Sequence, residues 1–249
     1  MPYPNIEFVI ALTGEKAAGK GKAARILAQE GGFAVFRFSD PIRVAHVLAS
    51  LHPKAPESPE LLAAKTADYI EMNMERDANG TELFGAEDYA LSLGVSPPQT
   101  VSLQDMGNRW RKKFGGGVFT DVLLAAAELL RMRRLVIDGF RNPGELEPLR
   151  AHLEGRWVAV GVVADIDVRK KRFLEKRRRV GDPVTEEDFL KLDRRDKGEG
   201  EPDDGQQVDR CLTLVQPENI IANNRSTTEL ETNIARWYRA QVEPRLDRE

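Results

Sequence analysis

The chain has 249 residues, of which 41% are apolar and 31% are charged, and its formal net charge is -3. This composition is typical of a globular protein with a substantial core, and the charge gives no general attraction to nucleic acid or anionic membranes. The single cysteine, Cys211, excludes an intramolecular disulfide framework, and no apolar run approaches the ~18 residues of a membrane span. No signal-peptide pattern opens the sequence, so we expect a cytoplasmic protein without membrane contact.

The first predicted element is a buried strand over residues 8–13, and a glycine-rich loop follows it directly. The loop matches the pattern G-x-x-x-x-G-K with Gly14, Glu15, Lys16, Ala17, Ala18, Gly19 and Lys20. Glycines let the backbone wrap a phosphate, N–H groups and the next helix supply partial positive charge, and Lys20 reaches the outer phosphates. The pattern therefore predicts binding of a nucleoside triphosphate. The alternative is a glycine-rich turn without a ligand.

Helices and strands alternate after this loop. A helix over 20–30 closes at Gly31-Gly32, and strands are expected at 33–38, 134–137, 157–163 and 219–222. This order predicts an α/β three-layer sandwich, with a mostly parallel five-stranded sheet covered by helices on both faces. Ligands of such sheets bind at the carboxyl ends of the strands. We expect one domain over residues 1–249.

Two stretches interrupt the alternation. Residues 52–103 contain five prolines and several charges, which predicts a partly helical insert that covers one side of the ligand site. Residues 177–207 are rich in charge and poor in apolar side chains. A mobile lid and a solvated surface loop are the two interpretations of this second stretch.

Several motifs resemble one family of enzymes. Gly19-Lys20-Gly21 is similar to the loop of adenylate kinase and other nucleoside monophosphate kinases. Segments 38–43, 103–109, 136–142 and 177–183 resemble the motif series of dephospho-CoA kinase-like proteins and phage-type deoxynucleoside monophosphate kinases. The resemblance implies a P-loop kinase fold, with ATP and Mg²⁺ as cofactors and a nucleotide-like acceptor.

Two positions depart from the pattern of the resembled loops. Gly21 stands where most such loops carry Ser or Thr, and Lys22 stands where adenylate kinases commonly carry threonine. The missing hydroxyl at position 21 removes the usual direct Mg²⁺ ligand on the loop. Gly21 and Lys22 are therefore predicted to bind the cofactor, but neither is predicted to bind the metal.

Four residues are the predicted catalytic groups: Lys20, Asp40, Asp138 and Arg141. Asp40 follows the second strand and is expected to accept a proton from the acceptor or to hold Mg²⁺ through water, with a helix N-cap as the alternative. Asp138 follows the third strand and is expected to order Mg²⁺-bound water, with a turn-initiating aspartate as the alternative. The resemblance implies that Asp40 lies beside the acceptor hydroxyl and that Arg141 binds an acceptor phosphate.

Further polar side chains are predicted to bind the acceptor: Asp40, Arg43, Gln104, Arg109, Lys113 and Arg141. Arg43 lies one helical turn beyond Asp40, and Gln104 belongs to a resembled motif. Arg109 and Lys113 form a basic segment in which Trp110 is a candidate for stacking a base. Helical arginines that pair with a neighbouring acid would give the same pattern.

The remaining cofactor candidates are Arg172, Arg177, Arg179 and Asn223. The three arginines lie on or just beyond a basic helix, and the resemblance implies that such arginines close over ATP from a lid. A solvated basic face is the alternative. Asn223 follows the fifth strand, where the resemblance implies a contact with adenine, and an asparagine turn is the alternative.

Three functions are compatible with these motifs. The first is an ATP-dependent kinase of a (deoxy)nucleoside monophosphate. The second is a kinase acting on a hydroxyl of dephospho-CoA, or of a hydroxymethylated base in phage DNA, which would make DNA a partner. The third is a non-catalytic ATP-binding switch. The sequence leaves a homodimer open.

Overall fold

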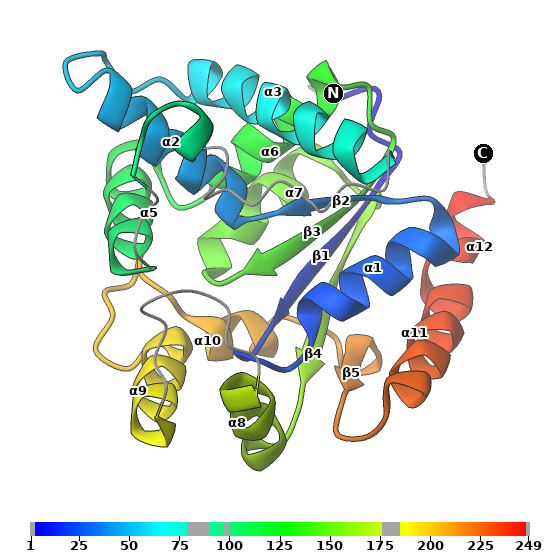
Figure 1. Ribbon diagram of the computed structural model, residues 1–249. Coiled ribbons are helices and arrows are strands. Elements are labelled where there is room, and N and C mark those ends of the chain that lie inside the picture. Colours follow the sequence, from blue (N-terminus) through cyan, green and yellow to red (C-terminus); the bar gives the residue numbers. More distant parts are fainter. Residues whose placement is uncertain (1–2, 79–89, 97–99, 176–184, 248–249) are drawn as a thin grey trace.

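A computed structural model describes residues 3–78, 90–96, 100–175 and 185–247 (Figure 1). Its sheet is made of five strands: β1 (Phe8–Gly14), β2 (Ala34–Arg37), β3 (Arg134–Phe140), β4 (Trp157–Val163) and β5 (Ile220–Ala222). All neighbouring strands are parallel, in the order β2-β3-β1-β4-β5. The structure thus confirms the predicted α/β fold with a parallel five-stranded sheet.

The central strand β1 is apolar throughout because both faces of the sheet are covered. Phe8, Ile10 and Leu12 point to one face, while Val9 and Ala11 point to the other. This alternation follows from the period of two in a strand, and it divides the core into two clusters on opposite sides of the sheet. A continuous apolar run in the sequence is therefore the expected signature of β1.

Helices form the outer two layers (Figure 1). One face carries α1 (Lys20–Gly31) and α11 (Thr227–Gln241), with the short α12 (Glu243–Leu246) beyond them. The other face carries α2 (Ser39–Leu51), α3 (Pro59–Ala78), α5 (Thr100–Phe114), α6 (Val118–Leu129) and α7 (Glu147–His152). The sheet is therefore the middle layer of three.

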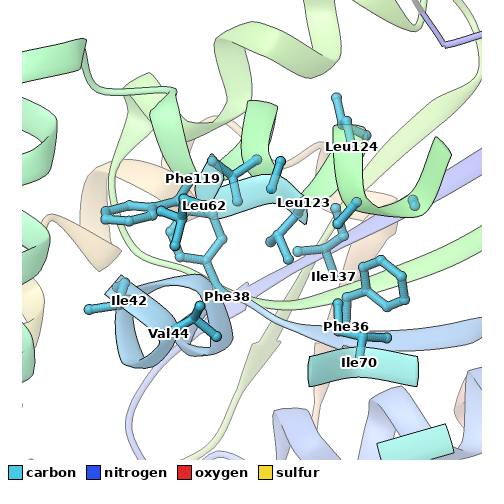
Figure 2. Close-up of a cluster of buried hydrophobic side chains, with 14 of the residues drawn as sticks. Phe36, Phe38, Ile42, Val44, Leu62, Ile70, Phe119, Leu123, Leu124 and Ile137 are labelled. Carbon is cyan, nitrogen blue, oxygen red and sulfur yellow. The ribbon is translucent and has the colours of Figure 1, made fainter. Parts of the chain in front are cut away.

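The core under α2, α3 and α6 is rich in aromatic side chains (Figure 2). The ring of Phe38 meets that of Phe119 edge-on, with centroids 6.1 Å apart. Leu62 and Ile70 of α3 pack into the same cluster. The long helix of the predicted insert 52–103 is therefore part of the core layer that supports β2 and β3.

The remaining described elements are helices that lie near the carboxyl ends of β1 and β4 (Figure 1), together with two short turns, one after β3 and one before β5. They are the 3-10 turns η1 (Pro143–Leu146) and η2 (Pro217–Asn219) and the helices α8 (Ile166–Glu175), α9 (Glu186–Lys197) and α10 (Val208–Thr213). Helix α9 lies within the predicted lid 177–207. Among the described residues, none of the helices has the length and apolar character to cross a bilayer.

Two local predictions need correction. Strand β3 continues to Phe140, so Asp138 lies inside the strand, opposite Leu12 of β1, and not after its end. The second strand, expected over residues 33–38, is shorter and occupies 34–37. Both differences arise at element ends, where pairing with a neighbour or fraying decides the boundary.

Candidate phosphate-binding site

The loop between β1 and α1 has the backbone of an anion-binding turn. Gly14, Ala17 and Gly19 have φ angles of 140°, 61° and 105°, and Gly19 is the N-cap of α1. Positive φ angles allow a loop to turn its N–H groups toward an anion, and the N-terminus of α1 adds partial positive charge there. A left-handed alanine is unfavourable on its own, so the surrounding structure must hold Ala17 in place.

Gly14 is required by the neighbouring strand. A Cβ atom at this position would lie 2.1 Å from the carbonyl oxygen of Val162, far inside van der Waals contact. Glycine at the end of β1 therefore allows the loop to leave the sheet while pressed against β4.

We expect Gly14→Ala to lower the free energy of unfolding by at least ~2 kcal/mol, because the methyl group meets backbone that cannot move aside. Gly155→Ala is the matched control, since Gly155 also has a positive φ, of 72°, but nothing lies within 4 Å of its Cβ position. The control should cost about 1 kcal/mol. Urea denaturation of both variants measures the difference, and equal losses would show that the contact with Val162 is unimportant.

Lys20 begins α1 and turns back over the loop. Its Nζ donates to the carbonyl oxygens of Gly14 (2.7 Å) and Glu15 (3.0 Å). Burial lowers the pKa of Lys20 to about 8, against the opposing effect of the Asp138 carboxylate. The ammonium group therefore remains mostly protonated at neutral pH and adds a full positive charge to the loop.

Asp138 faces the start of α1 from β3. A Cβ atom added to Gly21 would lie 3.5 Å from Oδ2 of Asp138. The carboxylate thus stands beside the position where most loops of this pattern place a hydroxyl. A carboxylate oxygen is a ligand suited to Mg²⁺ or to its bound water.

Asp40 is a buried carboxylate at the start of α2. Asp40 is 6% exposed. Its Oδ2 accepts a hydrogen bond from the backbone N–H of Arg37 at 3.3 Å, and Nη1 of Arg43 lies 3.8 Å from its Oδ1. Oδ1 has no hydrogen-bond partner among the described residues. The N-cap of α2 is Phe38, so Asp40 does not serve as a helix cap. Burial raises the pKa of Asp40 to about 6, although Arg43 and Arg37 oppose this effect.

The raised pKa of Asp40 has a consequence for stability. An aspartate that titrates near 3.8 when unfolded and near 6 when folded binds its proton more tightly in the native state. Ionised Asp40 therefore costs stability above pH 6, and this cost disappears below about pH 4. We expect Asp40→Asn to raise the free energy of unfolding at pH 7.5 by about 1–3 kcal/mol.

Urea denaturation at pH 7.5 and pH 4 measures this effect. The gain should vanish at the lower pH, where the native aspartate is already neutral. Asp68→Asn is the control, because the Asp68 side chain is exposed and pairs with Lys65 on the surface of α3. A destabilised Asp40→Asn protein at pH 7.5 would contradict the argument.

Arg141 and Lys16 meet on one acidic side chain of α9. The carboxylate of Asp196 lies 3.0 Å from Nη1 of Arg141 and 3.5 Å from Nζ of Lys16. Asp196 is buried at 3% exposure, and burial raises its pKa, but Arg141, Lys16 and Lys20 outweigh that effect and lower it. Asp196 is therefore ionised at neutral pH.

A second ion cluster fastens α8 and α9 to the loop. Arg169 of α8 is 1% exposed and pairs with Glu15 (3.0 Å) and with Asp193 of α9. Lys197 lies 3.2 Å from the same Glu15 carboxylate. Glu15 thus contributes its side chain to the scaffold, in addition to its backbone in the loop.

Arg111 and Glu145 form a buried ion pair behind Arg141. Nη2 of Arg111 lies 2.9 Å from the Glu145 carboxylate, and both side chains are at most 4% exposed. The same carboxylate accepts the backbone N–H groups of Arg141 (2.7 Å) and Asn142 (3.0 Å). This pair therefore fixes the backbone that carries Arg141.

Sequence reasoning did not single out Glu145, Asp193 or Asp196, and it placed Arg111 and Arg169 only within basic clusters. The only signal for the two aspartates was their spacing of three within the charged stretch 177–207, and exposed acids show the same spacing. Burial distinguishes Asp193 and Asp196 from exposed acids, and their burial depends on how α9 packs against the rest of the protein.

Two predicted substrate-binding residues lie elsewhere. Arg109 and Lys113 both pair with Glu57, at 2.7 and 2.8 Å. In the part of the chain that the structure describes, these two side chains pair with Glu57 and not with a residue of the loop. The proposal that Trp110 stacks a base is wrong, because its indole is 3% exposed and packs among core rings. Gln104 is half-buried on α5, and its Oε1 has no hydrogen-bond partner in the described part of the chain.

The other predicted cofactor residues form hydrogen bonds with the loop or with the segments packed beside it. Asn223 Nδ2 donates to the carbonyl oxygen of Ala18 at 2.7 Å, and Arg172 Nη1 donates to the carbonyl oxygen of Asn223 at 2.8 Å. Lys22 Nζ donates to Thr227 of α11. Arg177 and Arg179 lie outside the described residues.

Comparisons with known proteins give no family. No protein-family model matches the sequence, and no curated protein is significantly similar to it. The fold is similar to TT1252 from Thermus thermophilus, with 15% identity and a TM-score of 0.46 over 95% of this chain and 98% of that one. A sugar kinase from Janibacter sp. HTCC2649 gives 11% identity and a TM-score of 0.42 over 96% and 97% of the two chains. An uncharacterized protein from Eubacterium ventriosum ATCC 27560 gives 10% identity and a TM-score of 0.38, over 92% of this chain and 98% of that one.

Proposed function

We propose that this protein is an ATP- and Mg²⁺-dependent kinase, with a (deoxy)nucleoside monophosphate as its acceptor. The observation that carries the proposal is the phosphate-binding loop with Lys20 at the start of α1. Three further groups, Asp138, Asp40 and Arg141, come from β3, α2 and the segment after β3, around the carboxyl ends of the strands. Phosphoryl transfer requires cations around the transferred group and a carboxylate near the acceptor, and these residues supply both.

The residues of the loop fit a triphosphate. The N-terminus of α1, the Lys20 ammonium group and backbone N–H groups of the loop are donors for it, while the Ala18 N–H already donates to the carbonyl oxygen of Glu15 at 3.2 Å. Asp138, and Asp40 through water, would hold Mg²⁺, because carboxylate oxygens are its usual protein ligands. The metal supplies neutralisation of phosphate charge when bound.

Helices α2 and α5 are proposed to form the acceptor wall. They pack closely, since a Cβ atom at Gly107 of α5 would meet Cδ1 of Ile42 at 3.5 Å. Arg43 provides a cation for an acceptor phosphate, and the amide of Gln104 provides a polar group for a base. A pKa near 6 keeps Asp40 mostly ionised at neutral pH, as an acceptor of a hydrogen bond or a proton.

The environment of Asp40 also favours a second acceptor class. A buried carboxylate with an oxygen open to a new hydrogen bond is suited to take a proton from a hydroxyl, as on dephospho-CoA or a hydroxymethylated base. DNA would need a run of unneutralised cations leading to the site. Glu57 pairs with both Arg109 and Lys113, which reduces the positive charge of that segment.

The experiment is ADP release from Mg²⁺-ATP in the presence of nucleoside monophosphates, dephospho-CoA, or plain and hydroxymethylated DNA. Stimulation by one monophosphate, with a product heavier by one phosphoryl group, supports the proposal and names the base. Stimulation only by a hydroxyl acceptor selects the second class. ATP binding without any stimulation would leave the non-catalytic switch as the function.

A further inference from the structure

Asp196 stands among the cations at the loop where the proposed function places ATP. Lys16 belongs to the loop, Arg141 follows β3, and both approach the Asp196 carboxylate within 3.5 Å. The charge of Asp196 also acts on Lys20, the third cation. A buried carboxylate in this position makes contacts of the kind that a phosphate oxygen would make with the same side chains.

We propose that Asp196 is a built-in competitor for phosphate, which positions Lys16 and Arg141 in the nucleotide-free protein and releases them when phosphate binds. This inference rests on the proposed binding of ATP at the loop. Carboxylate and phosphate cannot share the same donors without repulsion, so each must weaken the binding of the other. Asp196 therefore lowers the affinity for ATP while it keeps the empty site ordered.

The other contacts of α9 allow this exchange. Asp193 pairs with Arg169, which also pairs with Glu15, so α9 keeps an attachment to the loop when its last turn moves. Asp196 lies in the last turn of α9, just before Gly198, which has a φ of 109°. A helix end can open with little cost compared with movement of the whole helix.

The test compares Asp196→Asn with Glu187→Gln, because each removes one negative charge from α9 and Glu187 is exposed. ATP and inorganic tripolyphosphate are titrated into each protein by calorimetry. We expect Asp196→Asn to bind both ligands more tightly, on the order of tenfold, while the control matches wild type. A purely structural role of Asp196 would weaken binding when it is removed. Unchanged or weaker binding by Asp196→Asn overturns the proposal.

A second measurement needs no variant. Amide hydrogen exchange of wild type, with and without ATP, should become faster over residues 194–200 and slower at the start of α1. Unchanged or slower exchange at 194–200 on ATP binding would count against release of Asp196, even if the variant failed to fold.

The two proposals fail in different ways. Tighter binding by Asp196→Asn without ADP formation from any acceptor would uphold the competitor and reject the kinase. Acceptor-dependent ADP formation with equal affinity in both proteins would do the reverse. If wild type and Asp196→Asn bind neither ATP nor tripolyphosphate, both proposals are rejected.

Discussion

Lys20→Ala is expected to reduce ATP-dependent turnover at least ~10²-fold. The ammonium group is held at the loop by two carbonyl oxygens, so under the proposed function it would lie beside the phosphates and add positive charge where negative charge develops during transfer. Removing it should cost transition-state stabilisation of several kcal/mol, because Lys22, the other lysine at the start of α1, donates to Thr227 of α11 instead. Steady-state ADP formation with the acceptor found in the panel measures the loss.

Arg25→Ala is the matched control. Arg25 lies on the same helix and is exposed, so its replacement removes one positive charge without touching the loop. We expect its turnover to stay within about twofold of wild type. Circular dichroism and the unfolding midpoint should show that Lys20→Ala is folded. Near-normal turnover of Lys20→Ala would remove the loop from the catalytic assignment.

Arg111→Met is expected to lower the free energy of unfolding by about 3–5 kcal/mol. The substitution keeps the approximate volume of the side chain but leaves the Glu145 carboxylate buried without its guanidinium partner. Burial already raises the pKa of Glu145, against the effect of Arg111, so loss of the arginine leaves the charged form strongly disfavoured. Turnover should fall as well, because Glu145 fixes the backbone of Arg141.

Arg109→Met separates burial from helix propensity. Arg109 lies on the same helix, but its side chain is 62% exposed in its ion pair with Glu57, so the loss should be below about 1 kcal/mol. Adding Glu145→Gln to Arg111→Met should restore part of the stability, since the neutral amide still accepts a backbone N–H. Urea denaturation measures all three proteins. A loss below ~1 kcal/mol in Arg111→Met would show that the pair is not a structural requirement.

The sequence predicts the fold well where local pattern decides the structure. The run before Gly14, the loop and the start of α1 form a strand, turn and helix, and each has its own residue signature. Strand β4 occupies exactly the predicted residues 157–163. Asp138 was predicted to follow the third strand, but it lies within β3. The pairing of β3 with β1 and β2 extends the strand beyond its apolar residues.

Long-range packing decides what the sequence does not predict. Trp110 and Arg109 are neighbours, yet one is buried among rings and the other pairs with Glu57 on the surface. Asp196 is one of many acids in a charged segment, and only the docking of α9 beside the loop brings it to Arg141. The ion pairs of Arg109 with Glu57 and of Arg141 with Asp196 join residues more than 50 positions apart, and no spacing rule within one helix or strand predicts them.

The most direct test of phosphoryl transfer is to follow the γ-phosphoryl group itself. ATP labelled in that group is incubated with the protein and the acceptor panel, and the labelled products are identified by mass. We predict label on one nucleotide-like acceptor with wild type, and a loss of at least ~10²-fold with Lys20→Ala. Label on no acceptor, or equal labelling by Lys20→Ala, would contradict a kinase that acts at this loop.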